Sequence, residues 1–396
     1  AEVTEILGRG LGLVADWVTV GPPDGQVHAD EATVDAARAA AAGAGWVISI
    51  GSGTVTDIGK AAAEGTPLIA VQTATSVNGY ADPFSVLLRS GAKRTTPTRW
   101  PDTLLIDPDV LADAPADLNR AGVGDLVSMF TSTADWYLAG AAGVDPSYDQ
   151  AVAAISRRYG GRLLHLAPGL AAGDGLAELA RILTLSGISM GVAGSTAPSS
   201  GMEHAISHLL EMSDTARGKP GSWHGTQVGV TTIVATATWA HVRRRISEGA
   251  LSGQAQMPDP DIARDQITAA FKGIDPDGAM AAECFADYSK KLQKLAAGPD
   301  PLAGLRDGWE QHDAVLGGLL TGPAELAGAV RSAGLPAQFG ALPDPVDDGQ
   351  ARWAVANCAL LRARFGVADL AMLLGCWEDN DVDQVLADAA VLAGSS

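Results

Sequence analysis

One stretch of the sequence, residues 46 to 72, restricts the possible folds more than any other. Trp46 to Ile50 forms an apolar run, Pro67 to Gln72 forms a second one, and an Ala-rich segment lies between them. Continuous apolar runs of this length are typical of strands that are buried on both faces of a parallel sheet. Two such strands joined through a helix make a right-handed crossover in nearly all cases. The sequence therefore predicts an α/β unit with a parallel sheet.

The segments before this unit extend the prediction. Glu31 to Gly43 is Ala-rich and follows Asp30, a suitable N-cap, so we expect a helix there. Ala15 to Val20 is predicted as a short strand. Residues 1 to 12 have a helical pattern instead, although a nucleotide-binding half of this kind normally begins with a strand. We therefore expect the first strand to be missing from this chain.

The rest of the chain, from about Ala112 onward, consists of long Ala/Leu-rich stretches with helical spacing. Gly and Pro separate these stretches, and no convincing alternating strand interrupts them. At 396 residues the chain is long for a single core. We expect a Rossmann-like α/β nucleotide-binding domain at residues 1–115 and an all-α metal- and substrate-binding domain at 116–396. The helices are predicted at 117–140, 147–169, 173–193, 201–212, 225–248, 261–297, 301–331 and 350–375.

Composition excludes several classes of partner. The net charge of −19 argues against nucleic acid, which proteins meet with a basic face, and against electrostatic docking on anionic membranes. No apolar run of about 18 residues is recognised that would predict a membrane-spanning helix, and no signal peptide is recognised. Cys284, Cys358 and Cys376 are few and widely spaced, which indicates buried thiols in a reducing compartment. We therefore expect a cytoplasmic protein.

A glycine turn joins the first predicted buried strand to its helix. Gly51 and Gly53 follow the strand directly, so the backbone N–H groups of the helix start are able to face a pyrophosphate. A Gly-x-Gly turn is equally often a matter of tight packing alone. The loop from Thr73 to Asp82 leaves the carboxyl end of the next strand, where ligands of open α/β sheets bind. Its many hydroxyl groups suit contacts with a nicotinamide and a ribose.

Three of the seven histidines lie between residues 204 and 224. His204 and His208 are four residues apart, so a helix places them on one face, and His224 follows after a short polar loop. Together with Asp125, two of these imidazoles form a three-ligand set that leaves a divalent metal one open position. That composition is typical of a catalytic site. The spacing alone does not choose between His204 and His208 as the ligand.

These motifs, in their order along the chain, resemble a known family. The motifs are Gly-Ser-Gly-Thr-Val-Thr-Asp at 51–57, Thr-Ala-Thr-Ser-Val-Asn-Gly at 73–79, Gly-Val-Gly-Asp at 122–125, Ser-Gly-Met-Glu-His-Ala-Ile-Ser-His at 200–208 and His-Gly-Thr-Gln-Val-Gly at 224–229. They are similar to those of the sn-glycerol-1-phosphate dehydrogenase family. That family lies within the superfamily of iron-containing alcohol dehydrogenases, glycerol dehydrogenase and dehydroquinate synthase. The resemblance runs from about residue 45 to 230 and returns weakly at 361–370.

The resemblance implies an NAD(P)- and metal-dependent alcohol dehydrogenase that acts on glycerol 1-phosphate, dihydroxyacetone phosphate or a related polyol (phosphate). Asp125, His204 and His224 would ligate a divalent metal (zinc first, nickel or iron otherwise), and His208 would meet the substrate and move a proton. Relatives commonly assemble, so a homo-oligomer is expected. The residues expected to contact NAD or NADP are Gly51, Gly53, Thr54, Val55, Thr56, Asp57, Thr73, Ala74, Thr75, Ser76 and Asp82.

The chain departs from the family pattern at three positions. Asn78 stands where the family usually has Asp, and an amide neither carries charge nor acts as a base. Asp82 stands where Ser is usual, and Met129 where Lys is usual. Asn78 therefore joins His208 and Asp125 as a candidate catalytic residue, and the changes favour a polyol or sugar-derived substrate. A substrate phosphate would be balanced by one of four cations: Lys60, Lys93, Arg94 or Lys219.

Two other functions remain open at this stage. The first is a sugar-phosphate cyclase resembling dehydroquinate synthase, which uses the same fold and metal and recycles its NAD. Such an enzyme shows no net nicotinamide turnover and releases phosphate. The second is a binding protein that keeps metal and nucleotide but has lost the substrate chemistry at Asn78.

Overall fold

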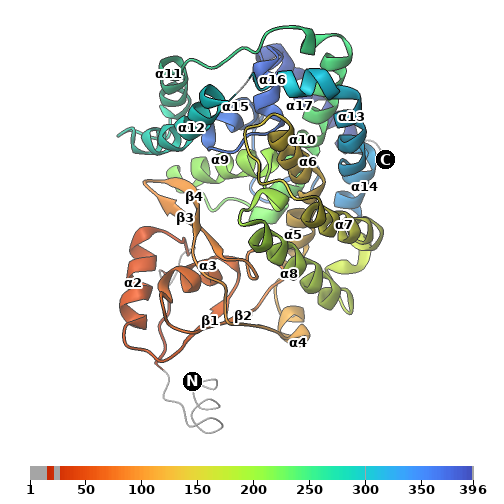
Figure 1. Cartoon of the computed structure of the whole chain (residues 1–396). Helices are drawn as coiled ribbons and strands as arrows, with labels where there is room; N and C mark the ends of the chain where they lie inside the picture. Colours follow the sequence, from red (N-terminus) through yellow and green to blue (C-terminus); the bar gives the residue numbers. More distant parts are fainter. Residues whose placement is uncertain (1–15, 22–26, 299, 395–396) are drawn as a thin grey trace.

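The computed structural model describes residues 16–21, 27–298 and 300–394. The chain forms an α/β part and a larger helical part, with the α/β part at the lower left of Figure 1. This arrangement confirms the predicted fold class. The helix predicted for residues 1 to 12 lies outside the described residues, and the domain boundary at residue 115 stays a prediction.

A parallel sheet is the framework of the α/β part. It contains β1 (Val47–Gly51), β2 (Leu68–Gln72) and β5 (Thr103–Ile106) in the order β1-β2-β5. Helix α3 (Gly53–Ala62) connects the first two strands and packs against both, with α2 (Glu31–Ala41) beside it. The predicted strand, glycine turn, helix and strand are all present.

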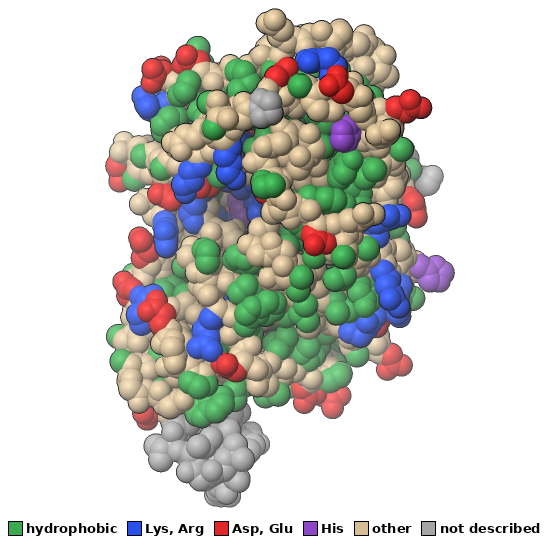
Figure 2. Space-filling view, viewed as in Figure 1, with side chains coloured by type: hydrophobic (Ala, Val, Ile, Leu, Met, Phe, Trp, Pro, Cys, Tyr) green, Lys and Arg blue, Asp and Glu red, His purple; other side chains and the backbone are tan. Residues whose placement is uncertain are grey.

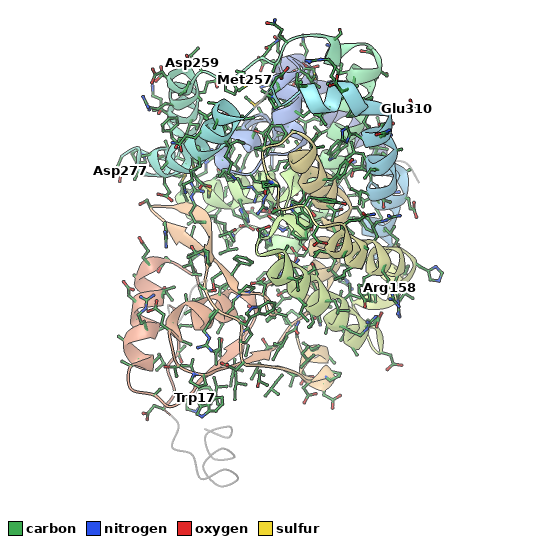
Figure 3. All side chains as sticks on the ribbon, viewed as in Figure 1. Trp17, Arg158, Met257, Asp259, Asp277 and Glu310 are labelled. Carbon is green, nitrogen blue, oxygen red and sulfur yellow. The ribbon has the colours of Figure 1, made fainter. Side chains whose placement is uncertain are left out.

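The strand predicted for Ala15 to Val20 is wrong for its described part, residues 16–20, which have no regular structure. Trp17 and Val18 are 55% and 53% exposed. Trp17 lies at the base of the α/β part (Figure 3). A strand needs a neighbour for its backbone hydrogen bonds. No described strand pairs with this segment, so an apolar pattern alone does not make it a strand.

A β-hairpin absent from the sequence prediction links the two parts of the molecule. Strands β3 (Phe84–Arg89) and β4 (Ala92–Pro97) are antiparallel and joined by the two residues Ser90 and Gly91. Both turn residues have positive φ, 48° and 77°, which is the conformation of the tight hairpin turn that suits twisted strands. The hairpin reaches toward the helical part (Figure 1), and β4 contacts helices of that part.

The helical part contains most of the predicted helices, several of them divided. The stretches 261–297 and 301–331 each form two helices, because Gly and Pro at their middles interrupt the backbone hydrogen bonds. The stretch 350–375 is interrupted by a 3-10 turn. The helices are α4 (Pro108–Ala112), α5 (Ala116–Leu126), α6 (Met129–Ala141), α7 (Gln150–Leu170), α8 (Gly175–Ala193), α9 (Met202–Ala216), α10 (His224–Ser247), α11 (Pro260–Phe271), α12 (Ala279–Ala297), α13 (Ala303–Leu319), α14 (Pro323–Ser332), α15 (Asp348–Asn357), α16 (Val367–Leu373) and α17 (Asp379–Gly394).

Among the described residues, α8 is long and apolar enough to pass a test for a membrane-spanning helix, with a mean hydropathy of 1.4 over the best window. This helix differs from the expectation that no apolar run in the sequence is long enough to span a membrane. Half of that window is buried inside the protein, and α8 packs against α7 and α5. A core helix passes the same test, so the finding is weak evidence for a membrane span.

Helices α5 and α10 cross with their backbones in contact. A Cβ atom on Gly124 would lie 2.1 Å from the carbonyl oxygen of Gly225, and one on Gly225 would lie 2.0 Å from that of Ala121. Only glycine permits this approach. The crossing brings the last turn of α5 beside the first turn of α10, so the glycines in both motifs determine where the neighbouring polar residues meet.

Gly225→Ala is expected to lower the free energy of unfolding by about 2–3 kcal/mol, because the added methyl group overlaps backbone atoms that have no side-chain freedom. Gly161→Ala in α7 is the control, since its Cβ would meet nothing within 4 Å. That change is expected to stabilise the protein by about 0.5–1 kcal/mol. Urea denaturation measures both. Equal stability of the Gly225→Ala variant and the wild type would show that the helices do not cross this closely.

Candidate metal and active site

A cleft of about 250 Å³ opens between the α/β part, the hairpin and the helical part. Figure 2 shows a hollow above the α/β part, with Lys and Arg side chains at its edge and histidine inside. The residues that line this cleft include Ser52, Gly53, Thr54, Asp57, Ser76, Asn78, Asp82, Lys93, Asp125, Thr196, Ser199, Ser200, His204, His208, Glu211, Lys219 and His224.

Three predicted ligands converge in the cleft. Asp125 lies in the last turn of α5, His204 in the first turn of α9, and His224 is the first residue of α10. One ligand atom from each lies within 4.8 Å of the others. The Oδ1 atom of Asp125 is 3.4 Å from Nε2 of His204 and 3.8 Å from Nε2 of His224. Both imidazoles thus present the same nitrogen toward one carboxylate oxygen.

Two glutamates hold the imidazole rings in this orientation. Nδ1 of His204 pairs with Glu203 at 3.0 Å, and Nδ1 of His224 pairs with Glu211 at 2.6 Å. A carboxylate on the outer nitrogen leaves the inner nitrogen unprotonated and aimed at a metal, as in many metal sites with histidine ligands. The other oxygen of Asp125 accepts the backbone N–H of Asn78 at 2.9 Å. The donor set and its geometry therefore fit a divalent metal with an open position.

The electrostatics of the two imidazoles differ. Burial alone would lower the pKa of His204, but hydrogen bonds and charges from Asp125 and Glu203 outweigh it and raise that pKa. Burial, reinforced by the charges of Lys93 and His204, lowers the pKa of His224 to about 3. His224 is consequently neutral at pH 7, the form in which an imidazole binds metal.

Glu203 and Glu211 were not selected by the sequence analysis. Glu203 precedes His204 directly, and Glu211 lies seven residues after it, which is two helical turns and hence the same face of α9. This spacing can be read from the sequence. The pairing of Glu211 with His224 cannot, because the position of His224 depends on the fold of the loop before α10.

Glu211→Gln is expected to weaken metal binding about 10- to 100-fold, because the amide keeps the shape but removes the charge that orients His224. Glu178→Gln serves as the control. Glu178 lies on α8, does not line the cleft, and pairs with Arg181 of the same helix and with Arg162 of α7. Competition with a fluorescent chelator gives both affinities. Unchanged affinity in Glu211→Gln would mean that His224 needs no carboxylate support.

His208 lies beside the metal ligands and makes no hydrogen bond within the described part of the chain. Its ring centroid is 6.1 Å from that of His204 and 5.6 Å from that of His224. The side chain is 5% exposed and lines the cleft. Burial, with the nearby charges of Lys93 and His224, lowers its pKa well below the usual range. His208 is therefore neutral and free to contact a ligand.

The residues expected to hold a nucleotide divide into two groups. Those that line the cleft are Gly53, Thr54, Asp57, Ser76 and Asp82. Those that do not are Gly51, Val55, Thr56, Thr73, Ala74 and Thr75.

Some members of the second group have packing roles. Gly51 allows the close approach of Val55, whose Cβ would lie 2.6 Å from an added methyl group. Thr75 is fully buried, and its backbone N–H and hydroxyl both bond the Asn119 side chain at 2.9 Å. The first turn of α3 and Ser76 thus remain as the surfaces open to a ligand.

Asp82 does not face a ligand as an isolated charge. Its carboxylate pairs with the fully buried Lys60 at 3.0 Å, and Lys60 also bonds Asp57 and the carbonyl oxygen of Gly79. Lys60 is thereby removed from the four candidate phosphate cations. Arg94 pairs with Glu283 and does not line the cleft.

The other two candidate cations line the cleft. Lys93 and Lys219 both do so, and Lys93 pairs with Glu211. Met129, the third departure from the family pattern, is buried in the core.

Comparison with known proteins shows the family to which this chain belongs. A family model described as iron-containing alcohol dehydrogenase matches residues 3–115. The glycerol-1-phosphate dehydrogenase (NAD(P)+) of Bacillus licheniformis is 36% identical over 264 residues, 65% of this chain and 63% of that protein. The protein of the same name from Haloquadratum walsbyi is 30% identical over 298 residues, 69% of this chain and 83% of that protein. This chain belongs to the glycerol-1-phosphate dehydrogenase family.

The alignment with other family members is partial. It covers 63% of the Bacillus licheniformis protein and 53% of the one from Aeropyrum pernix, so the chain spans little more than half of some of its relatives. Solved structures show the same fold. A probable glycerol dehydrogenase from Sinorhizobium meliloti has a TM-score of 0.59 at 15% identity, covering 93% of this chain and 84% of that one. Glycerol dehydrogenase from Schizosaccharomyces pombe has a TM-score of 0.53 at 16% identity, covering 92% and 74%.

Proposed function

We propose that this chain is a metal-dependent NAD(P) oxidoreductase that interconverts a ketone and a secondary alcohol. The proposed pair is dihydroxyacetone phosphate and glycerol 1-phosphate, or a closely related polyol phosphate. The observation that carries the proposal is the convergence of Asp125, His204 and His224 in one cleft with His208, which makes no hydrogen bond to any described residue. The curated relatives, which are glycerol-1-phosphate dehydrogenases, support the substrate class.

The metal would be held by Oδ1 of Asp125 and by Nε2 of His204 and His224. A divalent ion there polarises a carbonyl or hydroxyl oxygen of the substrate. We propose zinc, with nickel and iron as ions that accept the same ligands. The chain keeps these ligands fixed through Glu203, Glu211 and the backbone N–H of Asn78.

The nucleotide would lie against the first turn of α3 and the loop after β2. Its nicotinamide accepts or donates the hydride, and the proposal covers NAD and NADP alike. Gly53 and Thr54 line the cleft where the helix N-terminus favours a pyrophosphate. The carboxylate of Asp82 is turned to Lys60, which it shares with Asp57, so its charge is offset in part.

His208 is the proposed proton-transfer group. As a neutral imidazole in contact with the cleft, it accepts the hydroxyl proton of the alcohol during oxidation and returns a proton during reduction. Its lowered pKa favours the neutral form at pH 7. Asn78 lines the same cleft, and its amide, unlike the carboxylate of an Asp, does not act as a base.

The test is turnover of NADH and NADPH by the metal-loaded protein with dihydroxyacetone phosphate, followed together with phosphate release. Oxidation of the nicotinamide in proportion to the ketone supports the dehydrogenase. Phosphate release from a sugar phosphate without net nicotinamide turnover would contradict it and support the cyclase.

A further inference from the structure

The loop between α8 and α9 forms one wall of the cleft. It has the sequence Gly-Ser-Thr-Ala-Pro-Ser-Ser-Gly at 194–201 and contains a short 3-10 turn. Three of its hydroxyl residues line the cleft: Thr196, Ser199 and Ser200. The Arg-Ala-Arg sequence at 362–364 contacts this loop.

Two arginines bond this loop from the side away from the cleft. Nη1 of Arg362 donates to Oγ of Ser200 at 3.0 Å, and Nη2 of Arg364 donates to Oγ1 of Thr196 at 2.7 Å. Neither arginine lines the cleft. A guanidinium only donates, so both hydroxyl oxygens act as acceptors and their own hydrogens are left to donate. Each of these two hydroxyl groups therefore keeps a hydrogen that it can donate to a ligand in the cleft.

A second chain of hydrogen bonds reaches Ser199. Nδ2 of Asn78 donates to Oγ of Ser186 at 3.1 Å, and Oγ of Ser186 is 2.9 Å from Oγ of Ser199. Either hydroxyl can donate in the bond between Ser186 and Ser199, because each oxygen has two lone pairs. The chain therefore fixes the position of the Ser199 hydroxyl.

The carbonyl oxygens of the loop accept bonds from groups that do not line the cleft. Those of Pro198 and Ser199 accept hydrogen bonds from Ser132 and Ser128. Those of Ser200 and Gly201 accept bonds from Arg364 and Arg362. With these four carbonyl oxygens occupied and the hydroxyl oxygens of Thr196 and Ser200 accepting from arginine, the wall can present hydroxyl donors to the cleft.

The wall also has a positive electrostatic environment. Within the described part of the chain, neither Arg362 nor Arg364 lies within ion-pair distance of a carboxylate. Burial lowers the pKa of Arg364 to about 9, which still leaves it charged at pH 7. Lys93 and Lys219 face the same cleft. Hydroxyl groups held by two guanidinium groups are suited to an anion with several oxygens.

We propose that Thr196, Ser199 and Ser200 form the subsite for the phosphate group of the substrate. Arg362, Arg364 and the Asn78–Ser186 pair are positioning residues, which act through these hydroxyls. This inference rests on the proposed function for the identity of the occupant, a phosphate ester of a small ketone.

The test compares dihydroxyacetone phosphate with dihydroxyacetone in the metal-loaded wild type and in a Thr196→Val, Ser200→Ala double variant. KM for the phosphorylated ketone is expected to rise about tenfold for each hydroxyl, equivalent to about 1.4 kcal/mol for each hydrogen bond to a charged group. KM for dihydroxyacetone and kcat for both ketones should stay within about twofold. Ser189→Ala is the matched control, because Ser189 is buried and bonds only within α8.

The arginines are tested by the same comparison of KM for dihydroxyacetone phosphate with KM for dihydroxyacetone. Arg364→Gln should raise KM for the phosphorylated ketone selectively, and Arg364→Lys should restore part of the preference. Arg306→Gln is the control, since Arg306 bonds the carbonyl oxygens of Leu251 and Gly253 away from the cleft. Equal changes in KM for both ketones would overturn the subsite while leaving the dehydrogenase intact.

If the wild type reduces neither ketone, the proposed function fails, and titration calorimetry with inorganic phosphate still tests the subsite. Loss of phosphate binding in the double variant, with retention in Ser189→Ala, supports the subsite by itself. Retained phosphate binding in the double variant, or no binding by the wild type at millimolar phosphate, overturns it.

Discussion

Asp125→Ala is expected to abolish metal binding and ketone reduction together. Its Oδ1 atom is the point toward which both ligating imidazoles turn, and its side chain is 1% exposed, so no water replaces it easily. A metal that polarises the substrate is worth several kcal/mol, and about 4 kcal/mol corresponds to about a thousandfold in rate. We therefore expect turnover to fall by about a thousandfold or more.

The measurement is metal content by mass spectrometry beside the rate of NAD(P)H oxidation. Asp117→Ala is the control on the same helix, because its carboxylate is 72% exposed and pairs with the surface residue Arg120. That variant should keep both properties. An Asp125→Ala protein that retains stoichiometric metal and turnover would contradict the ligand assignment.

His208→Gln is expected to lower turnover about 10²- to 10⁴-fold, because the cleft loses its proton-transfer group. Metal content should stay at the wild-type level, since the ligand atoms come from other residues. This separates the two histidines that spacing alone left equivalent. His312→Gln is a control at a histidine outside the cleft, where the ring contacts Tyr137.

The metal content of the variants shows which of the two histidines, His204 or His208, is the metal ligand. If His208→Gln loses the metal while His204→Gln keeps it, the assignment of ligand and proton-transfer group is reversed. If both turnover and metal are unchanged, another group moves the proton.

The sequence predicted the framework because its signals were local. The buried strands at 47–51 and 68–72 and the glycine turn between them depend on residues that are adjacent in the chain. The hairpin at 84–97 was missed because its strands are only partly apolar, and Ser90-Gly91 was its one turn signal. The predicted strand at 15–20 failed for the opposite reason: it was apolar but had no partner among the described strands.

The site was predictable to the extent that its residues share a helix or a motif. His204 and His208 follow from helical spacing, whereas the choice between them came from the resemblance and not from spacing. The pairing of Glu211 with His224, the compensation of Asp82 by Lys60 and the hydroxyl wall backed by Arg362 and Arg364 join residues far apart in the chain. No local pattern encodes such contacts, because tertiary packing determines them.

The role of the metal is tested by dihydroxyacetone phosphate-dependent NAD(P)H oxidation in one preparation as purified, after metal removal and after reloading with zinc. We expect turnover that disappears with the metal and returns on reloading in the wild type, but does not return in Asp125→Ala. Turnover that persists in metal-free protein, or that zinc restores equally in Asp125→Ala, would contradict it.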